Sequence, residues 1–349
     1  MPIKNFNLII RKKINSFDKK ISVDSDKSLS IRSFLIGSIC QNISTAYNVL
    51  ESDDVKSTIE ACRKLGVKIV KIKPQSYKIY GKGLGSLYIK KNSEINFGNS
   101  GTLARLLIGI LSTSPNICIK IKGDHSLNKR NMSKLIDLMS EFGATFLPKQ
   151  KNTFPLKMIS SEMPVGINFK SGVSAQLKSA VIFAGLNSYG DTKIEEQVAS
   201  RNHTENLLMN NIQSIKIKKS KKKTIMVVGK KYLNPININI GGDPSSAAFF
   251  TALTLMNRNS SLLIRNVGLN HTRTGFYEIL KKQKVNLKFT NLKKENNEIR
   301  GDIIVKTSKL KPIKTEAAIY PRTTDEYLIL FVIAALTKGV STLKGIADL

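Results

Sequence analysis

The stretch SDKSLSIRSFLIGS, residues 25–38, is the first of five similar segments along the chain. Each segment opens on a hydroxyl or acidic side chain and continues with small and apolar residues, as a buried helix does. The five segments begin near Ser28, Ser100, Ser174, Ser246 and Thr324, at spacings of 72, 74, 72 and 78 residues. A period of this size predicts an architecture of repeated structural units.

A second, more polar helical pattern follows each of the first four segments. These patterns cover residues 53–70, 128–146, 203–217 and 271–289, and each leads into a β-like run. Alternating runs at 116–123, 224–229 and 236–242 also predict strands. One unit therefore has the order β-α-β-α-β-β, with a buried first helix and an amphipathic, solvent-facing second helix. The position just after each second helix is Gly66, Gly143, Ser214 and Lys284 in turn. The two glycines suit a left-handed residue, whereas Ser214 and Lys284 indicate that this feature is lost in the later units.

The length and composition are those of a globular α/β protein. The chain has 349 residues, 41% of them hydrophobic, which is enough for two domains. Its net charge of +31 would suit a nucleic-acid partner, but the lysines are dispersed and Trp is absent. The densest run, Lys216 to Lys223, is interpreted as a solvated hairpin turn between two strands, so a nucleic-acid partner is not favoured.

Cysteine usage and hydropathy point to a cytoplasmic protein without a metal. Cys40, Cys62 and Cys118 are odd in number and lack the spacing of a zinc site or a disulfide framework. The sequence contains no apolar run of about 18 residues that could span a bilayer, and no signal-peptide pattern is visible. We expect a cytoplasmic monomer with no membrane partner.

The starts of the buried helices are candidate anion sites, because a helix N-terminus offers free N–H groups and a positive dipole end. At the first start, Ser28 is expected to cap the helix, Lys27 supplies a point charge, and the guanidinium of Arg32 can grip a phosphate or carboxylate with two hydrogen bonds. The other starts contribute the residues Asn99, Ser100, Gly101, Thr102, Ser174, Gln176 and Asp325. We expect several of these starts to converge on one site.

Arginine is used sparingly, since 11 of the 56 basic residues are Arg. Six of the arginines fall in these motif-like segments. A planar guanidinium can hold an anion there with two hydrogen bonds, which the point charge of a lysine cannot do. Three of the six, Arg105, Arg273 and Arg322, are expected to be structural. The remaining three are Arg32, Arg130 and Arg201.

Eight motifs in order resemble those of the 5-enolpyruvylshikimate-3-phosphate (EPSP) synthase family, from about Ser22 to Leu349. The motifs are DKSLSIRSF (26–34), FGNSGTLARLL (97–107), GDHSLNKRNM (123–132), SAQLKSAVIFAGL (174–186), SRNHTE (200–205), GDPSSAAFF (242–250), NVGLNHTRTG (266–275) and TDEYLIL (324–330). The residues of the first and fourth motifs are similar to those of the divergent bacterial class of this family.

The resemblance implies an α/β fold, the two-domain inside-out α/β barrel of enolpyruvyl transferases. That fold has six β-α-β-α-β-β units in two three-unit domains, of which about five are present here. One domain should comprise residues 25–237. The other should combine residues 1–24 with residues 238–349.

The resemblance also implies a reaction that needs no metal and no organic cofactor. The enolpyruvyl group of phosphoenolpyruvate is transferred to the 5-hydroxyl of shikimate 3-phosphate, and phosphate is released. Catalysis is expected from Asp325, as general base, and from Lys27. Shikimate 3-phosphate should contact Lys27, Ser28, Arg32, Ser174, Ala175, Gln176, Arg201 and Asp325. Phosphoenolpyruvate should contact Lys27, Gly101, Arg130 and Gln176.

The sequence departs from the family pattern in three places. Leu106 and Asn131 replace prolines that are usual in the family, beside Gly101 and Arg130 respectively. The family's V-K-E-S-D-R segment, with its Lys-Glu pair, would follow GIADL, residues 345–349, and does not occur in this chain. We therefore expect a C-terminally truncated or split product that has little or no activity alone.

Two alternative functions remain open at this point. A UDP-N-acetylglucosamine enolpyruvyl transferase would share the fold, but that family usually carries a Cys in the loop that corresponds to GDHSLNKRNM, which has none. A non-catalytic basic fragment of the same fold that binds nucleic acid is the other alternative.

Overall fold

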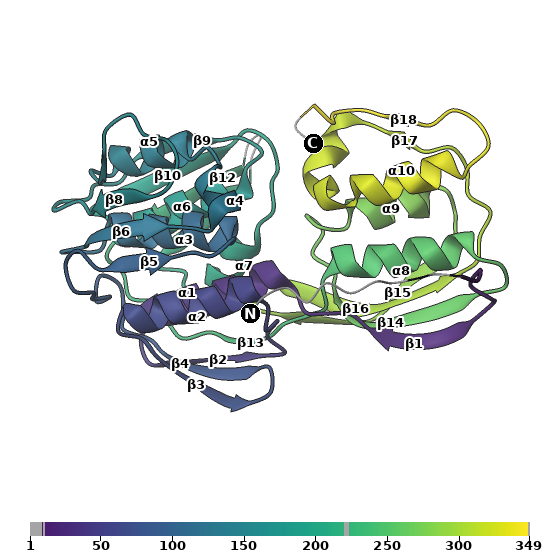
Figure 1. The fold of residues 1–349 in the computed structure, drawn as a ribbon, viewed down its shortest axis with the longest axis horizontal. Helices are drawn as coiled ribbons and strands as arrows, with labels where there is room; N and C mark the ends of the chain where they lie inside the picture. The colour runs from purple at the N-terminus through teal and green to yellow at the C-terminus, as the bar shows by residue number, and fades with distance from the viewer. Residues whose placement is uncertain (1–8, 10, 220–222, 348–349) are drawn as a thin grey trace.

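The computed structural model describes residue 9, residues 11–219 and residues 223–347, and shows two lobes side by side (Figure 1). Each lobe has its own hydrophobic core. One core contains buried residues from Leu29 to Ile240, and the other contains buried residues from Ala247 to Ile333. No helix in the described part of the chain is long and apolar enough to cross a membrane.

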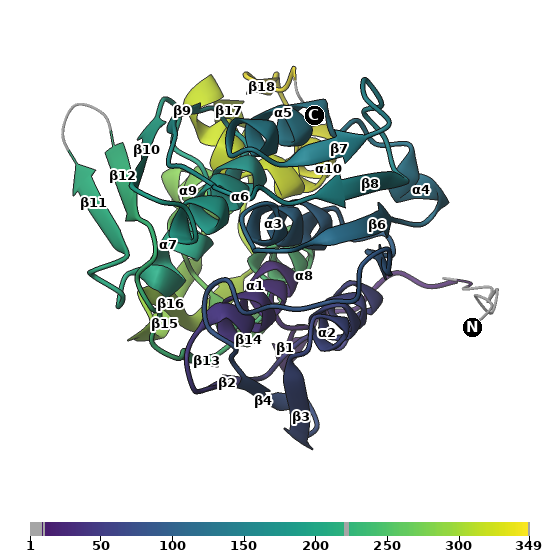
Figure 2. The same ribbon diagram turned by 90° about the vertical axis from the view of Figure 1, so that its left-hand side faces the viewer.

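The first lobe places three buried helices among three four-stranded sheets (Figure 2). The central helices are α1 (Lys27–Ile39), α3 (Gly101–Ser112) and α6 (Ala175–Leu186), and α3 contacts both of the others. Burying apolar side chains such as Ile31, Phe34 and Leu35 contributes roughly 1.5–3 kcal/mol each to folding. The other helices of this lobe are α2 (Asp53–Lys64), α4 (His125–Asn128), α5 (Ser133–Glu141) and α7 (His203–Leu208).

The sheets of the first lobe are ordered β13-β2-β4-β3, β5-β6-β8-β7 and β11-β12-β10-β9. Their strands are β2 (Ile43–Tyr47), β3 (Lys68–Lys73), β4 (Ser76–Tyr80), β5 (Glu94–Asn96), β6 (Cys118–Lys122), β7 (Thr145–Leu147), β8 (Leu156–Ile159), β9 (Asn168–Ser171), β10 (Asp191–Glu196), β11 (Ile215–Lys219), β12 (Lys223–Val228) and β13 (Asn237–Asn239).

The second lobe contains one four-stranded sheet of the same kind, followed by the first elements of another unit. Its sheet has the order β1-β14-β16-β15, and the short strands β17 and β18 form a parallel pair. The strands are β1 (Asp18–Ser22), β14 (Ser261–Gly268), β15 (Leu287–Glu295), β16 (Glu298–Lys306), β17 (Lys314–Thr315) and β18 (Thr342–Leu343). The helices are α8 (Pro244–Met256), α9 (Gly275–Lys282), α10 (Tyr327–Ala335) and the 3-10 helices η1 (Ala317–Arg322) and η2 (Thr324–Glu326).

All four large sheets have one topology, which confirms the predicted repeat of β-α-β-α-β-β units. In each sheet a parallel pair is followed by an antiparallel pair and an antiparallel hairpin. Two units exchange their first strands. Ile21 of β1 lies opposite Ile264 in the second lobe, and Ile238 of β13 lies opposite Ala46 in the first.

This exchange makes the chain cross between the lobes twice, and the two crossings pair with each other. The Asp26 amide donates to the Gly241 carbonyl at 2.9 Å, and the Asp243 amide donates to the Asp24 carbonyl at 2.8 Å. A Cβ at Gly242 would lie 2.8 Å from Val23 Cγ2 and 3.4 Å from the Val23 carbonyl oxygen. A larger residue at this crossing would therefore force Val23 to shift.

Four predicted features of the helix ends need correction. Asp26 rather than Ser28 caps α1, because Asp26 Oδ1 accepts from the Leu29 amide at 2.8 Å. Asp243 caps α8, which starts on Pro244. The residues from Thr324 form a 3-10 turn ahead of α10. Ser214 lies well beyond the end of α7 at Leu208. Gly66 and Gly143 have the predicted positive φ, and Lys284 has a positive φ although none was expected there.

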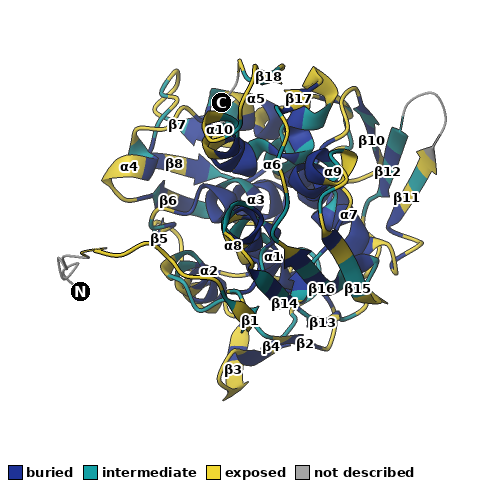
Figure 3. Ribbon diagram, turned by 90° about the vertical axis from the view of Figure 1, so that its right-hand side faces the viewer, coloured by how far each residue is buried: buried dark blue, intermediate teal, exposed yellow. Residues whose placement is uncertain are grey.

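The predicted burial holds for the first helix of each unit in the first lobe and fails in part elsewhere. Helices α1, α3 and α6 are buried along most of their length. In the second lobe, α8 and α10 expose large apolar side chains, among them Phe249, Phe250, Leu328 and Val332 (Figure 3). Helix α7, predicted to face solvent, is fully buried because it contacts β16 of the other lobe.

The predicted lysine-rich hairpin exists, since β11 and β12 pair antiparallel, and its tip at residues 220–222 lies outside the described residues. Lys223 is not solvated as expected. It pairs with Glu196 at 3.0 Å and with Glu205 at 3.2 Å. Lys178 of α6, fully buried, contacts the same two carboxylates at 2.5 and 2.7 Å. The two lysines and the two glutamates balance in charge, which offsets the cost of burying them.

Candidate functional site

A cavity of about 250 Å³ lies between the lobes and collects most of the predicted site residues. The first lobe supplies the start of α1, the start of α6 and the segment that leads into α7. The second lobe supplies η1 and η2. The lining residues are Ser28, Arg32, Val173, Ser174, Ala175, Gln176, Arg201, His203, Tyr320, Pro321, Thr324 and Asp325.

Arg32 enters this cavity from the first turns of α1 and is held by neutral partners. Its Nε donates to Thr204 Oγ1 at 2.9 Å, and its Nη2 donates to Ser179 Oγ at 3.4 Å. Burial lowers the pKa of Arg32 to about 10, against the attraction of Asp26 and other acidic groups. The guanidinium remains charged at neutral pH. It has no direct ion pair with a described residue, so an anionic ligand could supply one.

The start of α6 brings backbone donors to the cavity. Ser174 caps the helix through its Oγ, which accepts from the Leu177 amide at 3.4 Å. Gln176 then connects α6 to α3, because its Nε2 donates to Thr102 Oγ1 at 3.0 Å and its Oε1 accepts from Arg105 Nη1 at 2.9 Å. The predicted convergence of helix starts is thus observed for α1 and α6, with α3 joined through Gln176.

Arg201 and Asp325 meet across the lobes. Arg201 Nη2 lies 2.7 Å from Asp325 Oδ2, and Arg273 Nη2 lies 3.8 Å from the same oxygen. Burial would raise the pKa of Asp325, but the attraction of Arg201 and Arg273 outweighs it and lowers the pKa. Asp325 is therefore a half-exposed carboxylate at neutral pH, able to accept a proton.

A second cationic cluster lies around Gly101 at the start of α3. A Cβ at Gly101 would lie 2.7 Å from Arg105 Nη1 and 3.0 Å from Arg130 Nη1. Burial and the like charge of Arg130 lower the pKa of Arg105. Arg130 Nη2 donates to Asn99 Oδ1 at 2.7 Å, and neither guanidinium forms an ion pair within the described ranges. Two converging cations with only neutral partners suit an anion.

The structure does not bring Lys27 into the cavity. Its Nζ pairs with Asp54 Oδ2 at 3.0 Å, at the start of α2, and its side chain is half-exposed. Gly101 and Arg130 also lie outside the cavity, in the second cluster.

The three arginines expected to be structural differ from one another. Arg273 is buried among Asp26, Asp243 and Ser245. Arg322 donates to the His271 carbonyl and pairs with Glu278. Arg105 instead faces Gly101 with Arg130, so it belongs to the second cluster.

The sequence did not identify five residues that line the cavity: Val173, His203, Tyr320, Pro321 and Thr324. One signal could have identified His203, because the chain has only three histidines and this one stands two positions after Arg201. Tyr320 and Pro321 carry no comparable signal, since only the fold brings η1 to the lobe boundary.

A family model described as EPSP synthase (3-phosphoshikimate 1-carboxyvinyltransferase) matches residues 11–349. The chain belongs to the EPSP synthase family. The 3-phosphoshikimate 1-carboxyvinyltransferase of Zymomonas mobilis is 36% identical over 343 residues, which is 98% of this chain and 75% of that protein. The Bacillus subtilis enzyme of the same name is 35% identical over 97% of this chain and 78% of its own length.

Solved structures agree with the assignment to the EPSP synthase family. An EPSP synthase from Acinetobacter baumannii matches with a TM-score of 0.84 at 34% identity, covering 96% of this chain and 76% of that chain. The enolpyruvyl transferase NikO from Streptomyces tendae matches with a TM-score of 0.71 at 13% identity, covering 93% and 74%. The second similarity shows the shared fold, which is the predicted enolpyruvyl transferase fold.

Proposed function

We propose that the chain binds shikimate 3-phosphate in the interlobe cavity and carries out the reaction named in its relatives, transfer of the enolpyruvyl group of phosphoenolpyruvate to the 5-hydroxyl with release of phosphate. The observation that carries this proposal is the assembly of seven predicted contact residues in one cavity: Ser28, Arg32, Ser174, Ala175, Gln176, Arg201 and Asp325.

The cavity suits a phosphorylated ring with hydroxyl groups. Phosphate favours guanidinium groups, hydroxyls and helix N-termini, and these are what Arg201, Ser28, Ser174 and the start of α6 provide. Arg201 would exchange its contact with Asp325 for the ligand. Arg32, already aligned by Thr204 and Ser179, would face the same ligand.

Phosphoenolpyruvate is assigned to the second cluster. Gly101 lets the backbone approach an anion closely, and Arg130 and Arg105 supply charge on either side. Gln176 lies between this cluster and the cavity, so the two substrates would be neighbours. Lys27 would contact both substrates if its half-exposed side chain rotated away from Asp54.

Asp325 is assigned the role of general base. Asp325 is ionised before the reaction, and the transfer of Arg201 to the ligand would remove part of the attraction that lowers its pKa. The carboxylate would then be a stronger base for the proton of the attacking 5-hydroxyl. Addition to phosphoenolpyruvate then gives a tetrahedral intermediate, and elimination releases phosphate. The proposal includes a cytoplasmic monomer. Binding is the first test, because it reports on the interlobe cavity alone.

Calorimetric titration tests the proposal. We expect shikimate 3-phosphate to bind at least about 100-fold more tightly than shikimate, because the charge-assisted contacts to the phosphate are lost with shikimate. Inorganic phosphate alone serves as the control for a non-specific anion effect and should bind weakly. Equal affinities for shikimate and its 3-phosphate, or no binding of either, would refute the proposal.

A further inference from the structure

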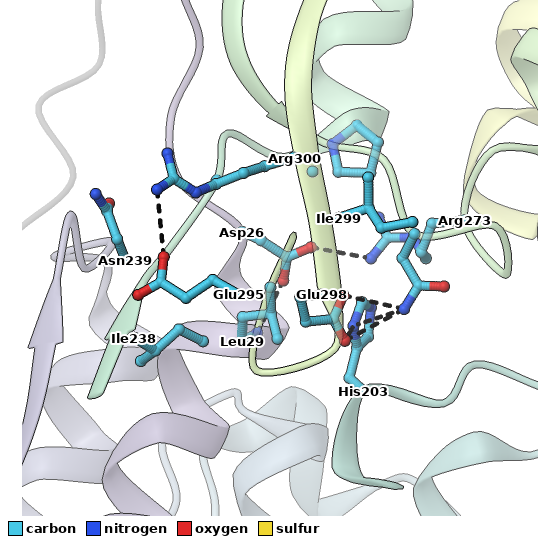
Figure 4. A pocket seen from close by; sticks show the side chains of 14 residues that line it. Asp26, Leu29, His203, Ile238, Asn239, Arg273, Glu295, Glu298, Ile299 and Arg300 are labelled. Carbon is cyan, nitrogen blue, oxygen red and sulfur yellow. Dashed lines mark hydrogen bonds and ion pairs between the residues drawn. The ribbon is translucent and has the colours of Figure 1, made fainter. Parts of the chain in front are cut away.

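His203 lies at the N-terminus of α7 and lines two cavities. It lines the interlobe cavity, and it also lines a smaller cavity of about 20 Å³ between the lobes (Figure 4). Its side chain is 3% exposed. None of the roles assigned above to either substrate involves this imidazole.

One nitrogen of the ring is engaged by the opposite lobe. His203 Nδ1 lies 2.9 Å from Glu298 Oε1, at the first residue of β16 (Figure 4). The same carboxylate accepts hydrogen bonds from Asn206 and Asn270 at 3.0 Å each. Burial would raise the pKa of Glu298, but the attraction and hydrogen bond of His203, with those amide donors, outweigh it and lower the pKa.

Glu298 therefore determines which nitrogen of His203 carries a proton. An ionised carboxylate only accepts, so Nδ1 must be the donor of the 2.9 Å hydrogen bond. The other nitrogen, Nε2, is then free to accept a hydrogen bond when the ring is neutral, or to donate one when it is charged.

Nε2 is buried and has no hydrogen-bond partner among the described residues. Leaving a buried polar atom unpaired is costly, so a histidine with only a structural role would be expected to have both nitrogens satisfied. The unpaired atom belongs to a residue whose neighbours in the larger cavity include Arg32 and Arg201. A ligand in that cavity could supply the missing partner.

We propose that His203 Nε2 forms a hydrogen bond with bound shikimate 3-phosphate, and that Glu298 is the positioning residue that holds the imidazole for this contact. The proposal deepens the proposed function and rests on it. It gives Glu298 of the second lobe an indirect part in substrate recognition, because Glu298 acts through a histidine of the first lobe. A ring hydroxyl would donate to neutral His203, and the phosphate would accept from the charged form.

Two amide substitutions separate the roles of the two nitrogens. In His203→Asn the side-chain amide can take the place of Nδ1 and keep the contact with Glu298, but nothing replaces Nε2. In His203→Gln the amide reaches the place of Nε2 and the contact with Glu298 is lost. We expect His203→Asn to weaken binding of shikimate 3-phosphate about 10-fold, and His203→Gln to stay within about 3-fold of the unsubstituted chain.

Nuclear magnetic resonance measures the chemical shifts of the imidazole nitrogens. If His203 had only a structural role, the ligand would leave the shift of Nε2 unchanged. The chain has three histidines, so the signals of His125, His203 and His271 can be assigned by removing each in turn. Saturating shikimate 3-phosphate is expected to shift the Nε2 resonance of His203. The His125 resonance serves as the internal control and should stay in place, because His125 is exposed on α4.

The outcomes distinguish this inference from the proposed function. If the unsubstituted chain binds shikimate 3-phosphate, but His203→Asn binds it equally well and Nε2 does not shift, the inference is wrong while the proposed function stands. If the unsubstituted chain does not bind shikimate 3-phosphate at all, both are wrong. Weaker binding by His203→Asn than by His203→Gln, with the Nε2 shift, supports the inference.

Discussion

Arg273→Ala is expected to lower the free energy of unfolding by about 3–5 kcal/mol, because it breaks a buried ion cluster by removing one partner. Arg273 is 4% exposed and holds the caps of two helices, with Asp26 Oδ2 at 3.2 Å and Asp243 Oδ1 at 3.0 Å. Those caps begin the helices that follow the two crossings between the lobes. Without the guanidinium, the buried carboxylate of Asp26 and the partly buried carboxylate of Asp243 would repel each other.

Urea unfolding followed by circular dichroism measures this change. Arg322→Ala is the matched control, since Arg322 also pairs with one carboxylate but its side chain is 26% exposed. A partly exposed pair contributes about 0–1 kcal/mol, so the control should lose little stability. Similar losses for the two variants would mean that the crossings do not depend on Arg273.

Arg32→Ala is expected to weaken binding of shikimate 3-phosphate by about 100-fold or more. Hydrogen bonds to charged groups contribute about 1.5–3 kcal/mol each, and the guanidinium can offer two to an anionic ligand. The loss of two such contacts exceeds the 2.8 kcal/mol that corresponds to about 100-fold. Calorimetry on the variant, with folding checked by circular dichroism, measures the change.

Two further variants make the Arg32 result specific. Arg32→Lys keeps the charge but not the planar fork, so we expect an intermediate loss of about 10-fold. Arg258→Ala removes an exposed arginine just after α8 and should bind shikimate 3-phosphate normally. An affinity unchanged in Arg32→Ala would remove Arg32 from the proposed site.

The repeat could be predicted from sequence because its signal is local. Each buried helix carries its own apolar pattern, and the period of about 72 residues needs no long-range information. The exchange of β1 and β13 between units is different. It depends on which strand edges meet in space. The sequence of β13, Asn237–Asn239, is compatible with pairing inside its own unit and with the observed pairing to β2 of another unit.

Helix caps and the burial of α7 also depend on three-dimensional contacts that the local sequence does not show. Ser28 and Asp26 are both good capping residues, and only the backbone geometry shows that Asp26 accepts from Leu29. Helix α7 was expected to face solvent from its polar residues, yet His203, Glu205 and Asn206 are buried because their partners come from other elements. Polar residues that pair across a lobe boundary have no signature in one sequence.

The site residues were found mainly through motif resemblance, and the structure adds their arrangement. The motifs named Arg201 and Asp325, which are 124 positions apart, but not their 2.7 Å contact across the lobes. The motifs also grouped Lys27 with Ser28, whereas the structure pairs Lys27 with Asp54 outside the cavity. Neighbours in sequence point in different directions from a helix start, so adjacency alone did not separate them.

The central claim is that shikimate 3-phosphate binds between the lobes, and a crystal structure of the chain with this ligand tests it most directly. The expected result is a ligand in the interlobe cavity, with its phosphate within hydrogen-bond distance of Ser28, Ser174 or Arg201 and its ring beside Asp325. Ligand density elsewhere on the molecule, with this cavity unoccupied at saturating concentration, would contradict the claim.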